Sequence, residues 1–134
     1  MTGVRTTYDG PQHCFALKEP QGKSVTMDCP YTGKGEEFSP TNLLEAALAG
    51  CMLLSMGALA TRNEIDISGT RIEVKISTTD KPPMRFNGID IEVAMPRDFS
   101  KKDRLRLERA AEACPIKHSF GSEIPISVSY SYPK

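Results

Sequence analysis

The chain has 134 residues, of which 39% are hydrophobic, and this size and composition suit a single domain with a modest core. Its 17 lysines and arginines balance its 17 aspartates and glutamates. The sequence therefore lacks the net charge that attracts nucleic acid or anionic lipid. We expect one domain over residues 1–134, and neither a nucleic-acid nor a membrane partner.

We expect neither a secretion signal nor a membrane span in this sequence. Residues 1–10 lack the basic start and the apolar run of a signal peptide. The longest apolar stretch, Ala46–Ala60, is shorter than the roughly 18 residues of a membrane span, so we expect a buried helix there. The sequence thus indicates a cytoplasmic protein, in which important cysteines are catalytic or sensing thiols rather than permanent disulfides.

Short strands are expected in the first third of the chain. Residues with strand-like alternation or apolar character occur at 4–8, 15–17 and 25–27. The turn residues Asp9-Gly10-Pro11 and Gln21-Gly22 separate them. This pattern predicts a small antiparallel meander, followed by an irregular loop over residues 31–38.

A long helix should follow the loop. Ser39 suits the N-cap and Pro40 the first helical position, so the helix is predicted to begin there and to run to about Asn63. Ala46, Gly50 and Gly57 would lie along one stripe of it. Each helical glycine costs about 1 kcal/mol relative to alanine. Close packing against another backbone, such as a second copy of the helix, would offset this cost.

The second half alternates strands and helices. Period-two patterns over residues 72–76 and 89–93 predict an antiparallel pair of strands. Ser100 and Asp103 resemble a capping box ahead of an amphipathic helix. Pro115 interrupts that helix, a brief helix over 116–120 follows, and alternation over 124–132 predicts a last strand. The order β-β-β-α-β-β-α-β indicates one α+β domain.

Two other groups of residues are not expected to form a phosphate-binding loop or a metal site. Gly22-Lys23-Ser24 ends like a phosphate-binding loop, but Leu17 stands where the first glycine is required and a strand follows. His13, Cys14, Cys29 and His118 match no compact ligand spacing. We therefore predict no metal and no cofactor.

Cys51 and Cys114 are the remaining candidates for chemistry. Cys51 lies in the most apolar helix, where a buried cysteine often serves only as a small hydrophobic residue. Cys114 directly precedes Pro115, so its sulfur should lie at a helix N-terminus, where N–H groups favour the thiolate.

Two segments around these cysteines resemble a known family. Residues 38–51, FSPTNLLEAALAGC, are similar to the central-helix motif of the osmotically inducible protein C and organic hydroperoxide resistance family (OsmC/Ohr). Residues 111–117, AEACPIK, are similar to its second motif, in which a Cys-Pro pair precedes a short helix. Together with the order of strands and helices, the resemblance covers nearly the whole chain.

The resemblance implies a fold, an assembly and an activity. It implies an intertwined homodimer with two identical sites at the subunit interface, in which the central helices pack in the middle. The peroxidase members are thiol-dependent, peroxiredoxin-like enzymes of the oxidative stress response. It implies that Cys51 attacks a hydroperoxide and that Cys114 resolves the resulting sulfenic acid as a disulfide, which an external thiol reductant restores. Cys51 and Cys114 should then lie within disulfide reach.

The sequence departs from the peroxidase pattern at the groups that activate the attacking thiol. Thr41 stands where those enzymes have a glutamate, and Glu45, six residues before Cys51, points around the helix from it. Arg5 is one candidate for the activating arginine. Two alternatives to a hydroperoxide reductase thus remain open: a non-catalytic dimer that binds a small apolar ligand, and a thiol sensor.

Overall fold

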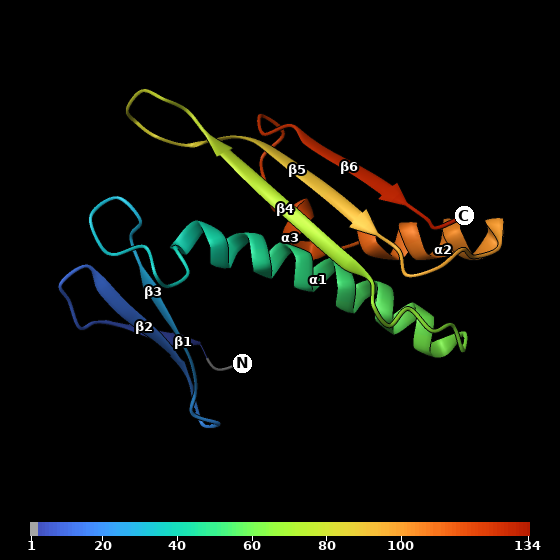
Figure 1. The fold of residues 1–134 in the computed structure, drawn as a ribbon, viewed down its shortest axis with the longest axis horizontal. Helices are drawn as coiled ribbons and strands as arrows, with labels where there is room; N and C mark the ends of the chain where they lie inside the picture. Colours follow the sequence, from blue (N-terminus) through green and yellow to red (C-terminus); the bar gives the residue numbers. More distant parts are fainter. Residues whose placement is uncertain (1–2) are drawn as a thin grey trace. The chain divides into compact units, whose positions relative to one another are not determined.

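A computed structural model describes residues 3–134 (Figure 1). The chain divides into two compact units, Met1–Leu44 and Glu45–Lys134, each with its own three-stranded sheet. The predicted α+β class and order of elements are confirmed. That residues 1–134 form a single folding domain stays a prediction.

The first unit contains the antiparallel meander that the turn residues predicted. Strands β1 (Val4–Tyr8), β2 (His13–Lys18) and β3 (Lys23–Asp28) pair in that order. The carboxylate of Asp28, the last residue of β3, accepts hydrogen bonds from the backbone N–H groups of Glu36 and Glu37 in the loop that follows, at 3.1 and 3.2 Å. These bonds fold the loop back on the end of the sheet.

Helix α1 (Pro40–Arg62) begins where the capping residues indicated and ends within one residue of the prediction. The Ser39 hydroxyl accepts a hydrogen bond from the Asn42 N–H at 3.0 Å, and the Asn42 side chain accepts one from the Ser39 N–H at 3.1 Å. This reciprocal cap satisfies N–H groups that a helix start otherwise leaves unpaired.

One face of α1 supplies much of the core of the second unit. Leu48, Met52, Met56 and Ala60 recur every four residues and are at most 2% exposed. They form one cluster with the buried residues of the second sheet and of the next helix, among them Ile89, Ile91, Val93, Leu107 and Ala111. The predicted buried helix is therefore buried on this face only.

By length and composition α1 could also cross a membrane. This is weak evidence, because the core helix of a soluble protein passes the same test. It corrects our sequence estimate, which counted only the uninterrupted stretch Ala46–Ala60, whereas the helix has 23 residues.

The second sheet places strands β4 (Arg71–Thr78), β5 (Phe86–Ala94) and β6 (Ile126–Ser131) in that order. Strands β4 and β5 form the predicted antiparallel pair. Strand β6 runs parallel to β5 and is shorter at both ends than the alternating pattern suggested. Figure 1 shows β6 reaching this position after the chain has passed through two helices.

Those helices are α2 (Lys101–Glu112) and α3 (Pro115–His118). The Ser100 hydroxyl accepts a hydrogen bond from the Asp103 N–H at 3.1 Å, which confirms the predicted cap of α2. Cys114 is the N-cap of α3. The chain thus turns sharply at the Cys-Pro pair and presents its sulfur to the start of a helix.

Candidate active site

The structure brings Cys51 and Cys114 together. Cys51 lies in α1 and is partly exposed, whereas Cys114 lies between α2 and α3 and is fully buried. Cys51 packs against the core cluster that contains Cys114 and lies close enough to raise the pKa of Cys114. Two thiols from distant parts of the sequence therefore meet at one edge of the core.

Burial decides the charge state of Cys114. Its sulfur accepts a hydrogen bond from the Lys117 N–H at 3.5 Å, so its predicted position at a helix N-terminus is confirmed. Burial nevertheless raises the pKa of Cys114, and the nearby Cys51 thiol raises it further, against the N–H groups of Lys117 and Ile116. The expectation of a favoured thiolate was wrong, and Cys114 is a protonated thiol at neutral pH.

The surface beside Cys51 is apolar and uncovered within the chain. A shallow hollow there is formed mainly by small and apolar side chains, those of Ala47, Gly50, Cys51, Leu54, Ser55 and Ile116. Leu54 is 78% exposed. A Cβ atom added to Gly50 or Gly57 would meet no other atom within 4 Å. Within the second unit as described, the glycine stripe therefore faces open space.

The candidate activating groups are engaged elsewhere. The Glu45 carboxylate accepts a hydrogen bond from the backbone N–H of Ile76 in β4 at 2.9 Å. Arg5 in the first unit forms an exposed ion pair with Glu19 at 3.4 Å. This agrees with the helical-wheel argument that Glu45 is a poor substitute for the glutamate of the peroxidases.

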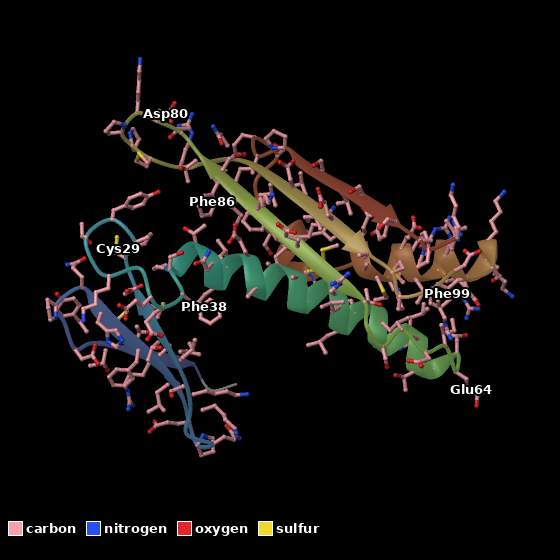
Figure 2. The ribbon with its side chains drawn as sticks, viewed as in Figure 1. Cys29, Phe38, Glu64, Asp80, Phe86 and Phe99 are labelled. Carbon is pink, nitrogen blue, oxygen red and sulfur yellow. The ribbon has the colours of Figure 1, made fainter. Side chains whose placement is uncertain are left out.

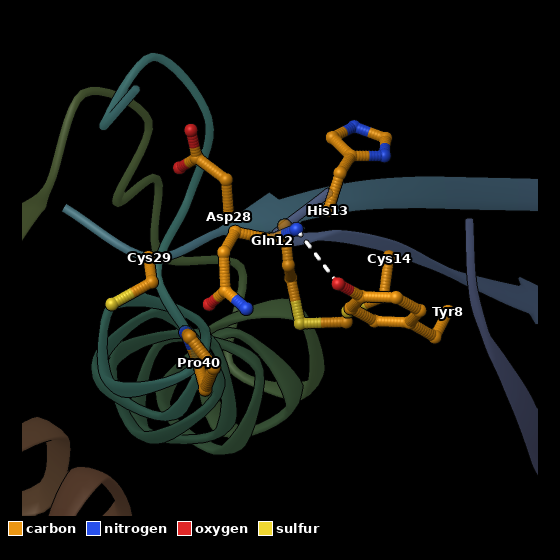
Figure 3. Close-up of a pocket in the computed structure, with 8 residues that line it drawn as sticks. Tyr8, Gln12, His13, Cys14, Asp28, Cys29 and Pro40 are labelled. Carbon is orange, nitrogen blue, oxygen red and sulfur yellow. Dashed lines mark hydrogen bonds between the residues drawn. The ribbon is translucent and has the colours of Figure 1, made fainter. Parts of the chain in front are cut away.

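The remaining histidine and cysteine candidates belong to different units. His13, Cys14 and Cys29 line a small cavity of about 200 Å³ in the first unit (Figure 3). His13 hydrogen-bonds to Asp9 at 2.5 Å, which raises the pKa of its imidazole. His118, in the second unit, hydrogen-bonds to the Glu112 carbonyl at 2.8 Å. Among residues 3–134, no group of three or more His, Cys, Asp or Glu side chains is arranged to hold a metal ion.

Sequence reasoning missed the special environment of Cys29, which lies in the loop after β3 (Figure 2). The Thr32 hydroxyl, followed by the backbone N–H groups of Thr32, Tyr31 and Gly33, lowers the pKa of Cys29. The signal was present in the sequence, since Cys29-Pro30 repeats the pair Cys114-Pro115. Similar N–H donors meet a solvated sulfur at Cys29 and a buried one at Cys114, so the two pKa values move in opposite directions.

Comparison with known proteins establishes the family. The model of the OsmC-like protein family matches residues 33–129. A crystal structure from Psychrobacter arcticus, described only provisionally as an osmotic stress induced and detoxification response protein, is 32% identical. The match covers 98% of this chain and 96% of that one, with a TM-score of 0.89. The chain therefore belongs to the OsmC-like family, and the resemblance drawn from residues 38–51 and 111–117 is confirmed.

More distant structures share the fold. The OsmC-like protein of Mycoplasma pneumoniae is 18% identical with a TM-score of 0.80, over 98% of this chain and 96% of that one. The organic hydroperoxide resistance protein OhrB of Bacillus subtilis is also 18% identical, with a TM-score of 0.70 over 97% and 98% of the two chains. None of the curated proteins compared with the chain matches it.

Proposed function

We propose that this protein is a thiol-dependent hydroperoxide reductase, with Cys51 as the attacking thiol and Cys114 as the resolving thiol. The observation that carries the proposal is the proximity of the two thiols at the edge of the core of the second unit, where Cys51 packs against the cluster that contains Cys114 and raises its pKa. The partly exposed Cys51 is accessible to a substrate, and the buried, protonated Cys114 is held beside it. This asymmetry supports Cys51 as the attacking thiol and Cys114 as the resolving thiol.

The reaction proceeds in three balanced steps. The Cys51 thiolate attacks the terminal oxygen of ROOH, the O–O bond breaks, and the products are a Cys51 sulfenic acid and, after protonation, ROH. Cys114 then attacks the Cys51 sulfur, loses its proton and expels water as the disulfide forms. An external dithiol returns two electrons and two protons by exchange and restores both thiols.

The apolar hollow beside Cys51 supports an organic hydroperoxide as the substrate. Ala47, Leu54 and Ile116 offer an alkyl or aryl group apolar surface next to the reactive sulfur. The related fold of OhrB of Bacillus subtilis belongs to a protein named for organic hydroperoxide resistance.

We further propose that the protein acts as a cytoplasmic homodimer. The open stripe with Gly50 and Gly57, together with the exposed Leu54, leaves an apolar face on α1 that a second copy would cover. The missing carboxylate and arginine for Cys51 would then come from the partner chain.

Peptide mapping after one equivalent of cumene hydroperoxide tests the mechanism. The parent protein should form a disulfide between Cys51 and Cys114. Cys51→Ser should abolish peroxide consumption, whereas Cys114→Ser should consume one equivalent and leave a Cys51 sulfenic acid that dimedone traps. Reduced Cys51 and Cys114 in treated parent protein would refute the two-cysteine mechanism.

A second candidate, favoured by the same hollow, is a non-catalytic dimer that binds a small apolar ligand. In this case Cys51 serves as packing and resists alkylation at neutral pH. The alkylation rate of Cys51 must be measured in a Cys29→Ser variant, because Cys29, with its lowered pKa, would otherwise account for most of the labelling.

A further inference from the structure

The turn that carries Cys114 is held by a side chain outside the proposed thiol pair. Glu112 ends α2, two residues before Cys114. Its carboxylate lies 3.8 Å from the Lys117 ammonium group in α3 and accepts a hydrogen bond from the Tyr130 hydroxyl in β6 at 3.2 Å. Its backbone carbonyl lies 2.8 Å from the His118 ring nitrogen. Glu112 thus spans the Cys-Pro turn and ties it to the sheet.

We infer that Glu112 is a positioning residue for the resolving thiol, acting through Lys117. This inference rests on the two-cysteine function proposed above. The backbone N–H of Lys117 is the donor to the Cys114 sulfur, at 3.5 Å. Fixing the Lys117 side chain against Glu112 therefore fixes the donor that orients the sulfur toward Cys51.

The turn needs such support because α3 is too short to be stable alone. It has four residues, begins with a proline that has no N–H, and contains no fully buried side chain. A helix of one turn costs more to nucleate than its few hydrogen bonds return. Contacts with α2 and β6 must therefore hold the position of Cys114.

The hydrogen bond from the Tyr130 hydroxyl to Glu112 persists at neutral and mildly alkaline pH. Burial and the neighbouring Glu112 carboxylate raise the pKa of Tyr130 above its ordinary range, so its hydroxyl remains a donor at neutral and mildly alkaline pH. The Lys117 side chain is only 18% exposed, which limits the loss of its ion pair to water.

The expected effect falls on the resolving step. A disulfide forms only within narrow limits of distance and dihedral angle, so a Cys114 that moves with its turn meets the Cys51 sulfenic acid less often. Loss of the partly exposed ion pair between Glu112 and Lys117 should slow disulfide formation by roughly two- to fivefold. The attack of Cys51 on the peroxide should be unchanged, since Glu112 does not contact that sulfur.

The test uses Glu112→Gln and Lys117→Gln in the full chain with Cys14 and Cys29 replaced by serine. Glu73→Gln is the matched control, because it removes an exposed ion pair with Lys75 at 3.6 Å on β4. Samples treated with one equivalent of cumene hydroperoxide are quenched and mapped for dimedone-trapped sulfenic acid and for disulfide, and samples treated with an excess of it are mapped for sulfinic acid. Both variants should oxidise Cys51 at the parental rate, form disulfide more slowly and accumulate more sulfinic acid, whereas Lys117→Arg should retain the parental rate.

A second readout separates this inference from the proposed function. The alkylation rate of Cys114 by iodoacetamide needs no peroxide and should rise in Glu112→Gln by a similar two- to fivefold. A parental alkylation rate, or faster alkylation with disulfide formation unchanged, would overturn the positioning role. Failure of the parent to form the disulfide would instead overturn the two-cysteine function, and the contacts of Glu112 would then have no role in catalysis. Tyr130→Phe supplies a further variant if Glu112→Gln does not fold.

Discussion

Replacing Gly50 with leucine gives opposite results for a monomer and for a dimer built on α1. Among residues 3–134, a Cβ at position 50 meets no atom within 4 Å, so a side chain here starts into open space. Leucine is also a better helix former than glycine, by about 0.8 kcal/mol. A monomer should therefore become more stable by about this amount.

A second copy reverses the sign. If α1 approaches its symmetry mate along the stripe with Gly50 and Gly57, four added carbons must fit into a close backbone contact. Overpacking of this kind costs about 1–3 kcal/mol. The net change should then be a loss of stability, a weaker dimer, or both.

Urea unfolding and sedimentation velocity at micromolar concentration measure the two effects. Lys102→Leu, on the exposed surface of α2, controls for adding leucine to a helix surface. Gly57→Leu should behave like Gly50→Leu, because both glycines face the same open space. A Gly50→Leu variant that is monomeric like its parent and more stable would refute the homodimer.

Three other perturbations test particular features. Cys29 should be the thiol that iodoacetamide labels fastest at pH 7, and Cys29→Ser should remove this fast phase; an unchanged time course in mass spectrometry would contradict its lowered pKa. The folded protein holds the Tyr130 proton more tightly than the unfolded chain, so stability should fall as the pH rises above about 10, and Tyr130→Phe should lessen this fall. Urea midpoints measured on both sides of that pH test this. An equal loss of stability with pH in the parent and in Tyr130→Phe would argue against a raised pKa. Met52→Ala deletes a fully buried side chain and should cost about 2–5 kcal/mol in urea unfolding, whereas a cost under 1 kcal/mol would mean that the site collapses or is not packed as described.

Local sequence signals were sufficient for most of the fold. The Ser39 and Ser100 caps fixed where α1 and α2 begin, since each cap depends on residues within one turn. The alternation of apolar and polar residues predicted β4 and β5, because this pattern is also local in the sequence. The parallel pairing of β5 with β6 could not be read from the sequence, because it depends on where α2 and α3 return the chain.

The candidate site shows a similar division. The motifs selected Cys51 and Cys114, but only the packing of α1 against the turn before α3 makes their thiols neighbours. The pKa of Cys114 was predicted in the wrong direction, since the sequence shows the proline and the helix start but not the burial. The contacts that Glu112 makes could not be predicted from the sequence, because Tyr130 comes from a distant strand.

The contact between Glu45 and β4 bears on how the sheet avoids unwanted partners. Among residues 3–134, β4 pairs on one side only, with β5, so its other edge carries backbone groups that a strand from another molecule could join. The Glu45 carboxylate already accepts the Ile76 N–H on that edge and places a negative charge there. An intruding strand would have to displace a charged acceptor supplied by the same chain. We therefore expect Glu45 to hinder edge-to-edge pairing at β4.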